Sequence, residues 1–145
     1  MSNVSPERRK TARRKPPITI SDTEKAALER LADAWSMRQP EVTDELMAEI
    51  DRAQIVPDAR MRSDVVRMGS SLTYETESGE ARSISLVYPR DADIAEGRVS
   101  VLTPIGTALI GLSPGQSIEW QARDGRIHRL TVTRVEQQME RLAAS

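Results

Sequence analysis

The chain contains 145 residues, of which 38% are hydrophobic and 30% charged, and it has no Cys. This length fits one domain, or one domain with an appendage, and the absence of Cys excludes disulfides, thiolate metal sites and a Cys nucleophile. No apolar stretch approaches the ~20 residues of a membrane span, and no apolar signal segment follows the basic N-terminus, so we expect a cytoplasmic protein without a membrane partner.

Basic side chains are concentrated at the N-terminus, although the net charge of the chain is only −1. Residues 1–17 carry six basic side chains and one acid, a net charge of +5, so residues 18–145 carry −6. The segment has no apolar periodicity and ends in two prolines, which predicts a disordered basic tail over residues 1–17. The tail is either a solvated leader or a weak contact for nucleic acid or another acidic surface. Its candidate contacts are Arg8, Arg9, Lys10, Arg13, Arg14 and Lys15.

Two amphipathic helices are predicted after the tail. The sequence from Ser21 to Glu24 is a capping box, which predicts a helix that begins after Ser21 and ends near Met37. Pro40 suits the first turn of a second helix. Because each apolar face needs a partner, residues 18–57 are predicted to form a short antiparallel helical hairpin, or short coiled coil. The apolar faces consist of Ala27, Leu28, Leu31, Ala34 and Trp35 in the first helix, and Val42, Leu46, Met47, Ile50 and Ala53 in the second.

From Asp64 onward, the apolar period changes from that of a helix to that of a strand. One short helix interrupts this region, from Pro104 to about Ile110, with Gly111 after it. These signals predict that residues 58–145 form an α+β domain, a twisted antiparallel sheet of about five strands with one short helix. The predicted strands contain Val65-Val66, Leu72-x-Tyr74, Ile84-x-Leu86-x-Tyr88, Val99-x-Val101, Ile118-x-Trp120 and Leu130-x-Val132.

The chain offers little for catalysis or metal binding. His128 is the only His, and it shares a predicted strand face with Leu130, which favours a partly buried position at the edge of the core. No nucleophile elbow, phosphate-binding lysine or kinase motif is present, so we expect no catalytic residue, metal or cofactor. Trp120 is expected in the core. Trp35, near the hairpin tip, either staples the two helices together or contacts a partner.

Several segments of the chain resemble one known family. They are LVYP at 86–89, VSVLTPIGTALIGL at 99–112, GQSI at 115–118 and EIDRA at 49–53. These segments resemble the GreA/GreB transcription elongation factors and the short Rnk-type members of that family, which are named as regulators of nucleoside diphosphate kinase. The resemblance implies an FKBP-like C-terminal domain that docks at the rim of the RNA polymerase secondary channel. It also implies an N-terminal coiled coil that points into the channel.

The predicted hairpin tip differs from that of the cleavage-stimulating members. In those factors, the resemblance implies, an acidic pair at the tip helps to hold the second catalytic Mg²⁺ of the polymerase, a cation that prefers oxygen ligands. Here the tip, from Trp35 to Glu41, has no adjacent carboxylate pair, and Arg38 would oppose a metal. A helix ending near Met37 is also only about 24 Å long, roughly half the length that the resemblance implies. We therefore expect a non-enzymatic regulator that binds RNA polymerase and competes with Gre-type factors without stimulating cleavage.

The candidate contacts with RNA polymerase lie in two places. In the relatives, an acidic residue followed by Ser-Pro precedes the short helix, and the matching positions here are Leu102, Thr103 and Pro104. Trp35 and Arg38 are the candidates at the hairpin tip. We expect the protein to act as a monomer.

Two other functions remain open at this point. FKBP-like folds support peptidyl-prolyl isomerase activity, which needs an aromatic-lined pocket, and this domain has only Tyr74, Tyr88 and Trp120. A nucleic-acid binder acting through the basic tail is the other alternative. Six phosphate contacts would give it a log–log salt dependence with a slope of up to about −5.

Overall fold

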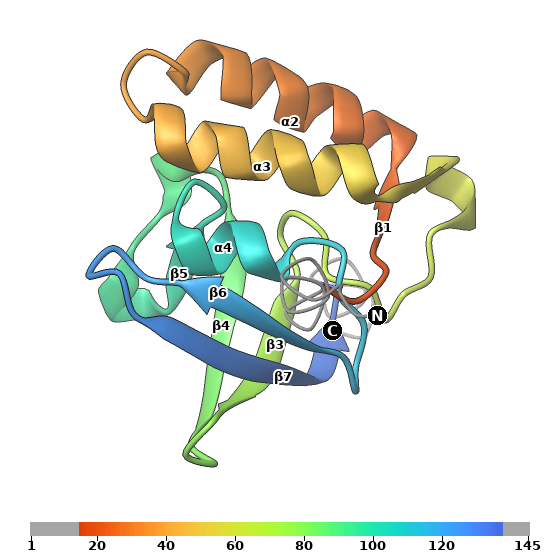
Figure 1. Ribbon diagram of the computed structural model, residues 1–145. Coiled ribbons are helices and arrows are strands. Elements are labelled where there is room, and N and C mark those ends of the chain that lie inside the picture. The colour runs from red at the N-terminus through yellow and green to blue at the C-terminus, as the bar shows by residue number, and fades with distance from the viewer. Residues whose placement is uncertain (1–14, 138–145) are drawn as a thin grey trace, which may run out of the picture.

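The computed structural model describes residues 15–137 as a helix pair packed on a curled β-sheet (Figure 1). The helices are α2 (Asp22–Trp35) and α3 (Pro40–Arg52), and a third helix, α4 (Pro104–Leu109), lies between them and the sheet. Two short strands, β1 (Thr19–Ser21) and β2 (Gln54–Val56), flank the helix pair. The predicted antiparallel hairpin of helices is therefore present.

Helix α2 begins where the sequence predicts, but only half of the capping box forms. The Glu24 amide donates to the Ser21 hydroxyl over 3.1 Å, which satisfies one of the free amides of the first turn. The Glu24 carboxylate instead accepts a hydrogen bond from Arg67, 43 residues away in the sequence. The helix ends at Trp35, two residues before the predicted Met37.

The small parallel sheet of β1 and β2 was not predicted. Thr19 of β1 pairs with Gln54 of β2, and the Thr19 amide donates to the Gly111 carbonyl over 3.2 Å. Gly111 has a φ of 83°, and a Cβ on it would lie 2.9 Å from the Ile18 Cβ. Only glycine fits this position, so the strand that precedes α2 is fixed against the turn that follows α4.

The main sheet has five strands in the order β5-β4-β3-β7-β6. Their bounds are β3 (Ser71–Thr76), β4 (Ala81–Val87), β5 (Arg98–Ser100), β6 (Ser117–Gln121) and β7 (Ile127–Glu136). All neighbouring pairs are antiparallel except β4 and β5, which are parallel, so the sheet is mixed and the prediction of an antiparallel sheet is wrong at this edge. The connection over residues 88–97 contains two 3₁₀ turns and returns the chain to Ser85, so β5 runs parallel to the last three residues of β4.

The predicted strand at Val65 and Val66 is absent. Both side chains are buried, but the segment is irregular. The Val66 amide donates to the Leu112 carbonyl over 2.8 Å, and the Gly111 amide donates to the Val66 carbonyl over 2.9 Å. These two residues therefore cover the turn after α4 instead of joining the sheet.

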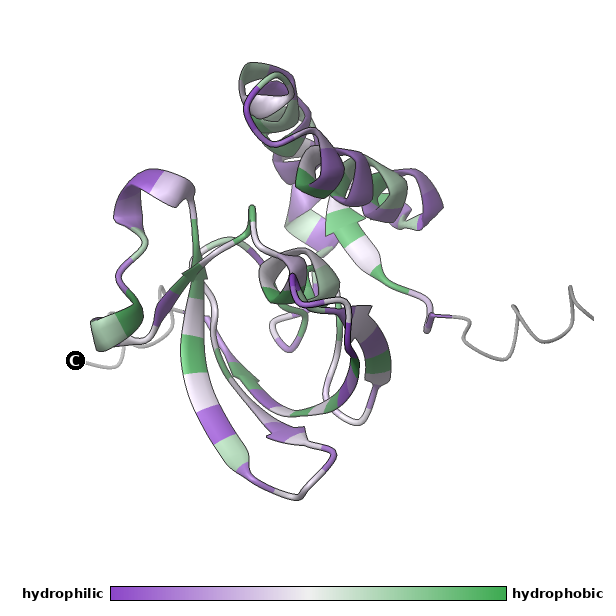
Figure 2. Cartoon of the chain, turned by 60° about the vertical axis from the view of Figure 1, so that its left-hand side comes forward, coloured by the Kyte–Doolittle hydropathy of each residue, from purple (hydrophilic) through white to green (hydrophobic). Residues whose placement is uncertain are grey.

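One hydrophobic core runs through the helix pair and the sheet. Figure 2 shows α4 inside the curl of the sheet. The core contains Leu28 and Leu46 from the helix pair, Leu109 from α4, and Leu86 and Leu130 from the sheet. The burial of these side chains supplies the main favourable free energy of folding and holds the helix pair on the domain.

Candidate partner-binding site

The loop before α4 is held by hydrogen bonds within the chain. The Thr103 hydroxyl donates to the Ser100 carbonyl over 2.7 Å and accepts from the Gly106 amide over 3.0 Å, so Thr103 is the N-cap of α4. The Thr107 hydroxyl donates to the Val101 carbonyl over 2.8 Å. A Cβ on Gly106 would lie 2.1 Å from the Ser100 carbonyl oxygen, so the helix can approach the strand end this closely only at a glycine.

The three predicted contacts in this loop are not equally available to a partner. Leu102 is 2% exposed and belongs to the core, so its side chain is not at the surface where a partner would touch it. The Leu102 amide donates to the Ser100 hydroxyl over 3.0 Å, and the apolar side chain is buried in the core. Thr103 and Pro104 are both partly exposed, and the Thr103 hydroxyl is already engaged by the cap.

The hairpin tip presents an apolar side chain and a cation. The Arg38 guanidinium carbon lies 5.2 Å from the centre of the Trp35 ring, a cation–π contact. Trp35 is half-buried and packs against the core, which supports the stapling role over full exposure to a partner. Met37, between them in sequence, is 93% exposed. No carboxylate lies between Trp35 and Pro40.

A groove between α3, α4 and β6 joins the two predicted contact regions. Its larger part, about 1020 Å³, is lined by Arg38, Glu41, Glu45 and Pro104, among others. A smaller part of about 160 Å³ shares Glu45 and Pro104 with it and extends to Glu49. The structure thus brings Arg38 of the tip and Pro104 of the docking loop to one concave surface, a juxtaposition that the sequence pattern did not show. We call this surface the α3–β6 groove.

A buried carboxylate in the smaller part of the α3–β6 groove is paired with two cations. The Glu49 side chain is 1% exposed, and its carboxylate lies 2.5 Å from the Lys15 ammonium and 2.7 Å from the Arg52 guanidinium. Burial raises the pKa of Glu45, one turn away, and the neighbouring Glu41 and Glu49 raise it further, while Lys15 opposes them. Lys15 and Arg52 therefore both neutralise Glu49, while Glu45 lies beside two carboxylates that raise its pKa.

Only the end of the predicted tail lies within the described residues. The Arg52 side chain donates to the Pro16 carbonyl over 2.5 Å, and the Gln116 side chain donates to the Pro17 carbonyl over 2.9 Å. Residues 15–17 thus contact α3 and the turn before β6. The other predicted tail contacts lie outside the described residues: Arg8, Arg9, Lys10, Arg13 and Arg14.

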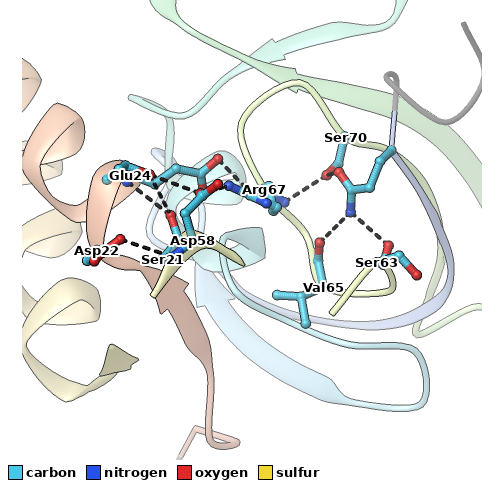
Figure 3. A network of polar contacts seen from close by, with 10 residues as sticks. Ser21, Asp22, Glu24, Asp58, Ser63, Val65, Arg67 and Ser70 are labelled. Atoms are coloured by element: carbon cyan, nitrogen blue, oxygen red, sulfur yellow. Dashed lines mark hydrogen bonds and ion pairs between the residues drawn. The ribbon is translucent and has the colours of Figure 1, made fainter. Parts of the chain in front are cut away.

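A second polar cluster ties α2 to the domain (Figure 3). The Arg67 guanidinium donates to the Glu24 carboxylate over 3.1 Å and also to the Asp58 carboxylate. Hydrogen bonds from Thr23, Ser21 and Arg67 lower the pKa of Asp58, while burial raises the pKa of Glu24 despite its contact with Arg67. These residues are far apart in sequence, and the cluster was not predicted.

A continuation of this cluster holds the last described residue of the chain. The Ser70 hydroxyl donates to the side-chain oxygen of Gln137 over 2.6 Å. The Gln137 side-chain amide donates to the carbonyls of Ser63 and Val65, over 2.9 and 2.8 Å (Figure 3). The segment that precedes β3 is therefore fixed on one side by α2 and on the other by the end of β7.

His128 and Trp120, for which we expect no catalytic role, pack against each other. His128 is half-exposed near the start of β7, an interior strand of the sheet, and its ring centre lies 5.1 Å from that of Trp120 on β6. Trp120 is partly buried, so it lies at the margin of the core. Within residues 15–137, no cluster of three or more His, Cys, Asp or Glu side chains could hold a metal ion. No helix in that range combines the length and the apolar character needed to cross a membrane.

Two family models match separate parts of the sequence. The model described as "Transcription elongation factor, GreA/GreB, C-term" matches residues 61–137, and the model of the Rnk N-terminus matches residues 16–56. The first match coincides with the curled sheet and α4, and the second with the helix pair. Neither match covers residues 1–15, which contain the basic side chains of the tail.

Several proteins match between 57% and 87% of this chain. The "Regulator of nucleoside diphosphate kinase" of Escherichia coli K12 is 35% identical over 127 residues, which cover 87% of this chain and 93% of that protein. A solved structure, the prokaryotic transcription elongation factor GreA/GreB from Nitrosomonas europaea, is 36% identical with a TM-score of 0.66, over 84% of this chain and 99% of that one. GreA of Rhodospirillum rubrum is 35% identical over 57% of this chain and 54% of its own length. The chain therefore belongs to the Rnk/GreA–GreB family, and the predicted α+β class with an FKBP-like domain is confirmed.

Proposed function

We propose that this protein binds RNA polymerase at the rim of the secondary channel and competes there with Gre-type factors without stimulating transcript cleavage. Family membership supports the partner, since the relatives include proteins named transcription elongation factors. In this proposal the protein acts in the cytoplasm as a monomer. It regulates transcription by occupying a site and catalyses no reaction.

The hairpin tip is the observation that carries the proposal. A factor that supplies a ligand to the polymerase Mg²⁺ needs carboxylates at the point that reaches the metal. The tip instead presents Arg38, stacked on Trp35, and the exposed Met37. A cation at this point would repel the metal that a cleavage factor helps to hold.

The length and direction of the hairpin support the same conclusion. Helices α2 and α3 have 14 and 13 residues, so they are about 21 and 20 Å long. The pair also lies along α4 on the domain instead of projecting from it (Figure 1). A hairpin of this length would fill the entrance of the channel but would not extend to the catalytic metal.

A cleavage assay on backtracked RNA polymerase tests the proposal. We expect no RNA shortening with this protein alone, and slower shortening when it is added to a reaction driven by GreA. Higher GreA concentrations should restore the rate, because competition depends on the ratio of each concentration to its dissociation constant. Shortening by the protein alone, or full GreA activity at saturating protein, would contradict the proposal.

A matched pair of variants tests the docking loop in the same assay. Pro104→Glu places a charge in the α3–β6 groove while an acidic residue in the first turn remains favourable for α4. Ala95→Glu adds the same charge at an exposed position outside the groove. We expect the first variant to lose inhibition of GreA and the second to retain it, and equal inhibition by both would exclude Pro104 as a contact.

Within residues 15–137, the aromatic side chains do not favour the isomerase alternative. Tyr74 is buried on β3, and Trp120 and Tyr88 line separate cavities. The three aromatic side chains of the domain therefore do not gather around one proline-sized pocket. The nucleic-acid alternative depends on side chains outside the described residues.

A further inference from the structure

We propose that Met37, at the tip of the helix pair, anchors the contact with RNA polymerase by inserting into an apolar pocket of that partner, beside a carboxylate that accepts Arg38. This inference rests on the proposed function, and it names the chemistry of the polymerase surface that the tip would meet. Neither the family matches nor the names of the relatives assign a role to Met37.

Met37 is the most exposed large apolar residue within residues 15–137. It lies in the loop between α2 and α3, at one end of the helix pair (Figure 1). The next residues of this loop, Arg38 to Pro40, line the α3–β6 groove together with Pro104. The other exposed large apolar residues in this range lie outside that loop; they are Ile55, Ile94 and Ile127. The exposure of Met37 therefore occurs beside the proposed contact surface.

The loop that carries Met37 is held by hydrogen bonds on both sides. The amides of Arg38 and Gln39 both donate to the Trp35 carbonyl, over 3.0 and 2.9 Å. The hydroxyl of the buried Thr43 donates to the Gln39 carbonyl over 3.0 Å, and Trp35 packs against the core. The backbone around Met37 is therefore fixed before binding. A partner that buries this side chain does not have to order the loop, which lowers the entropic cost of the contact.

A methionine at this point is suited to anchor a contact. Its flexible, polarisable side chain adapts to pockets of irregular shape. At interfaces a few buried side chains carry most of the binding energy, and burial of one large apolar side chain corresponds to about 10- to 100-fold in affinity. The docking loop offers less, because Leu102 lies in the core and the Thr103 hydroxyl caps α4.

Arg38 determines which charge the facing surface should carry. Its side chain is exposed, and its guanidinium carbon lies 5.2 Å from the centre of the Trp35 ring. No carboxylate occurs between Trp35 and Pro40. A guanidinium that lies over an aromatic ring keeps the N–H donors at its edge for a carboxylate. An apolar pocket with a carboxylate at its edge therefore complements Met37 and Arg38 together.

Binding of full-length variants to immobilised RNA polymerase tests the proposal. We expect Met37→Ser to raise the dissociation constant at least about tenfold. Met37→Leu should keep the wild-type value, because it restores an apolar side chain of similar volume. Ile55→Ser is the matched control, since it removes an exposed apolar side chain from β2, beyond the opposite end of α3, and it should leave the dissociation constant unchanged. Urea unfolding of Met37→Ser should match that of the wild type, because the side chain is exposed.

Sodium chloride separates the apolar contact from the charged one. Arg38→Gln should weaken binding at about 0.05 M salt, and most of this effect should disappear at about 0.5 M, where the Debye length is only a few ångströms. The ratio of the dissociation constants of Met37→Ser and wild type should be the same at both concentrations, because the burial of apolar surface is not screened. A Met37→Ser effect that disappears with salt would overturn the apolar pocket, and an Arg38→Gln effect that ignores salt would overturn the carboxylate.

Two further results would overturn the proposal. If the wild type binds polymerase and Met37→Ser loses no more affinity than Ile55→Ser, Met37 is not the anchor, while the proposed function stands. If the wild type sediments as a dimer that Met37→Ser separates, the side chain packs against a second copy of the chain instead. Failure of the wild type itself to bind polymerase would refute the proposed function, and this inference with it.

Discussion

Removal of Arg67 should show how strongly the polar cluster of Arg67, Glu24 and Asp58 holds the helix pair on the domain. The Arg67 side chain is 23% exposed and the Glu24 side chain 15%, so Arg67→Ala leaves a mostly buried carboxylate without its cation. Breaking a fully buried pair in this way costs about 3–5 kcal/mol. Glu24 keeps some contact with water and a backbone hydrogen bond from Met68, so we expect a loss of about 1–3 kcal/mol in the free energy of unfolding at pH 7.

The loss should depend on pH in a defined direction. Burial already raises the pKa of Glu24 in the folded wild-type protein, and Arg67 opposes that rise, so the variant should raise the pKa further. A raised folded pKa removes stability as the pH rises from the unfolded pKa through the folded one. The lowered pKa of Asp58, to which Arg67 contributes, adds stability above its unfolded pKa that is lost in acid. Both effects make the cost of Arg67→Ala smaller near pH 4 than at pH 7.

Urea denaturation of wild type and variant at the two pH values measures this cost. Arg62→Ala is the matched control, because the Arg62–Asp64 pair is bidentate but its two side chains are 70% and 42% exposed. Exposed pairs contribute about 0–1 kcal/mol. If Arg67→Ala costs no more than Arg62→Ala, or costs the same at both pH values, the cluster does not hold the helix pair in the way described.

Two further predictions concern function. Arg38→Asp with Gln39→Glu creates an acidic pair at the hairpin tip. We still expect no transcript cleavage from this variant, because helices of about 20 Å are too short to reach the catalytic metal. RNA shortening by the variant in the backtracked complex would show that the protein lacked only the charge. The rate of proline isomerisation in a peptide should not exceed the uncatalysed rate, since Trp120 and Tyr88 line separate cavities. Turnover that is abolished by Trp120→Ala, in a variant that still folds, would instead support isomerase activity.

Local signals in the sequence were sufficient for the helices and for most strands. Ser21 caps α2 and Pro40 begins α3 because both act through their own backbone neighbours. Pro104 at the start of α4 and the glycine after that helix follow from the same kind of local chemistry. Such features depend on spacing within one or two turns, which is what a sequence records directly.

Features that depend on distant partners could not be predicted in this way. Strand periodicity says which side chains are buried but not the direction of a neighbouring strand, so the parallel pairing of β5 was missed. Val66 is β-branched and buried, as in a strand, yet its backbone pairs with the turn after α4. Strands β1 and β2 have three residues each, too few to show a period.

The candidate site shows the same division between local and distant information. The family resemblance indicates candidate contacts in the docking loop and at the tip, but it does not indicate that Pro104 and Arg38 line one groove. Leu102 is a candidate contact only through its position in the family motif, where it replaces an acidic residue, and its side chain lies in the core. The ion pair of Lys15 with Glu49 joins residues 34 positions apart, and no spacing rule indicates such a contact.

The fit of Ile18 against Gly111 restricts how members of this family could exchange their parts. A methyl group on residue 111 would collide with Ile18. A helix pair grafted from another family member, together with the strand before it, therefore needs a glycine at position 111 of the recipient domain. Leu28, Leu46 and Leu109 also share one core, so a graft that keeps the surface but changes this seam would leave cavities or overlaps. We therefore expect the helix pair and the C-terminal domain to unfold together on heating, in a single cooperative transition.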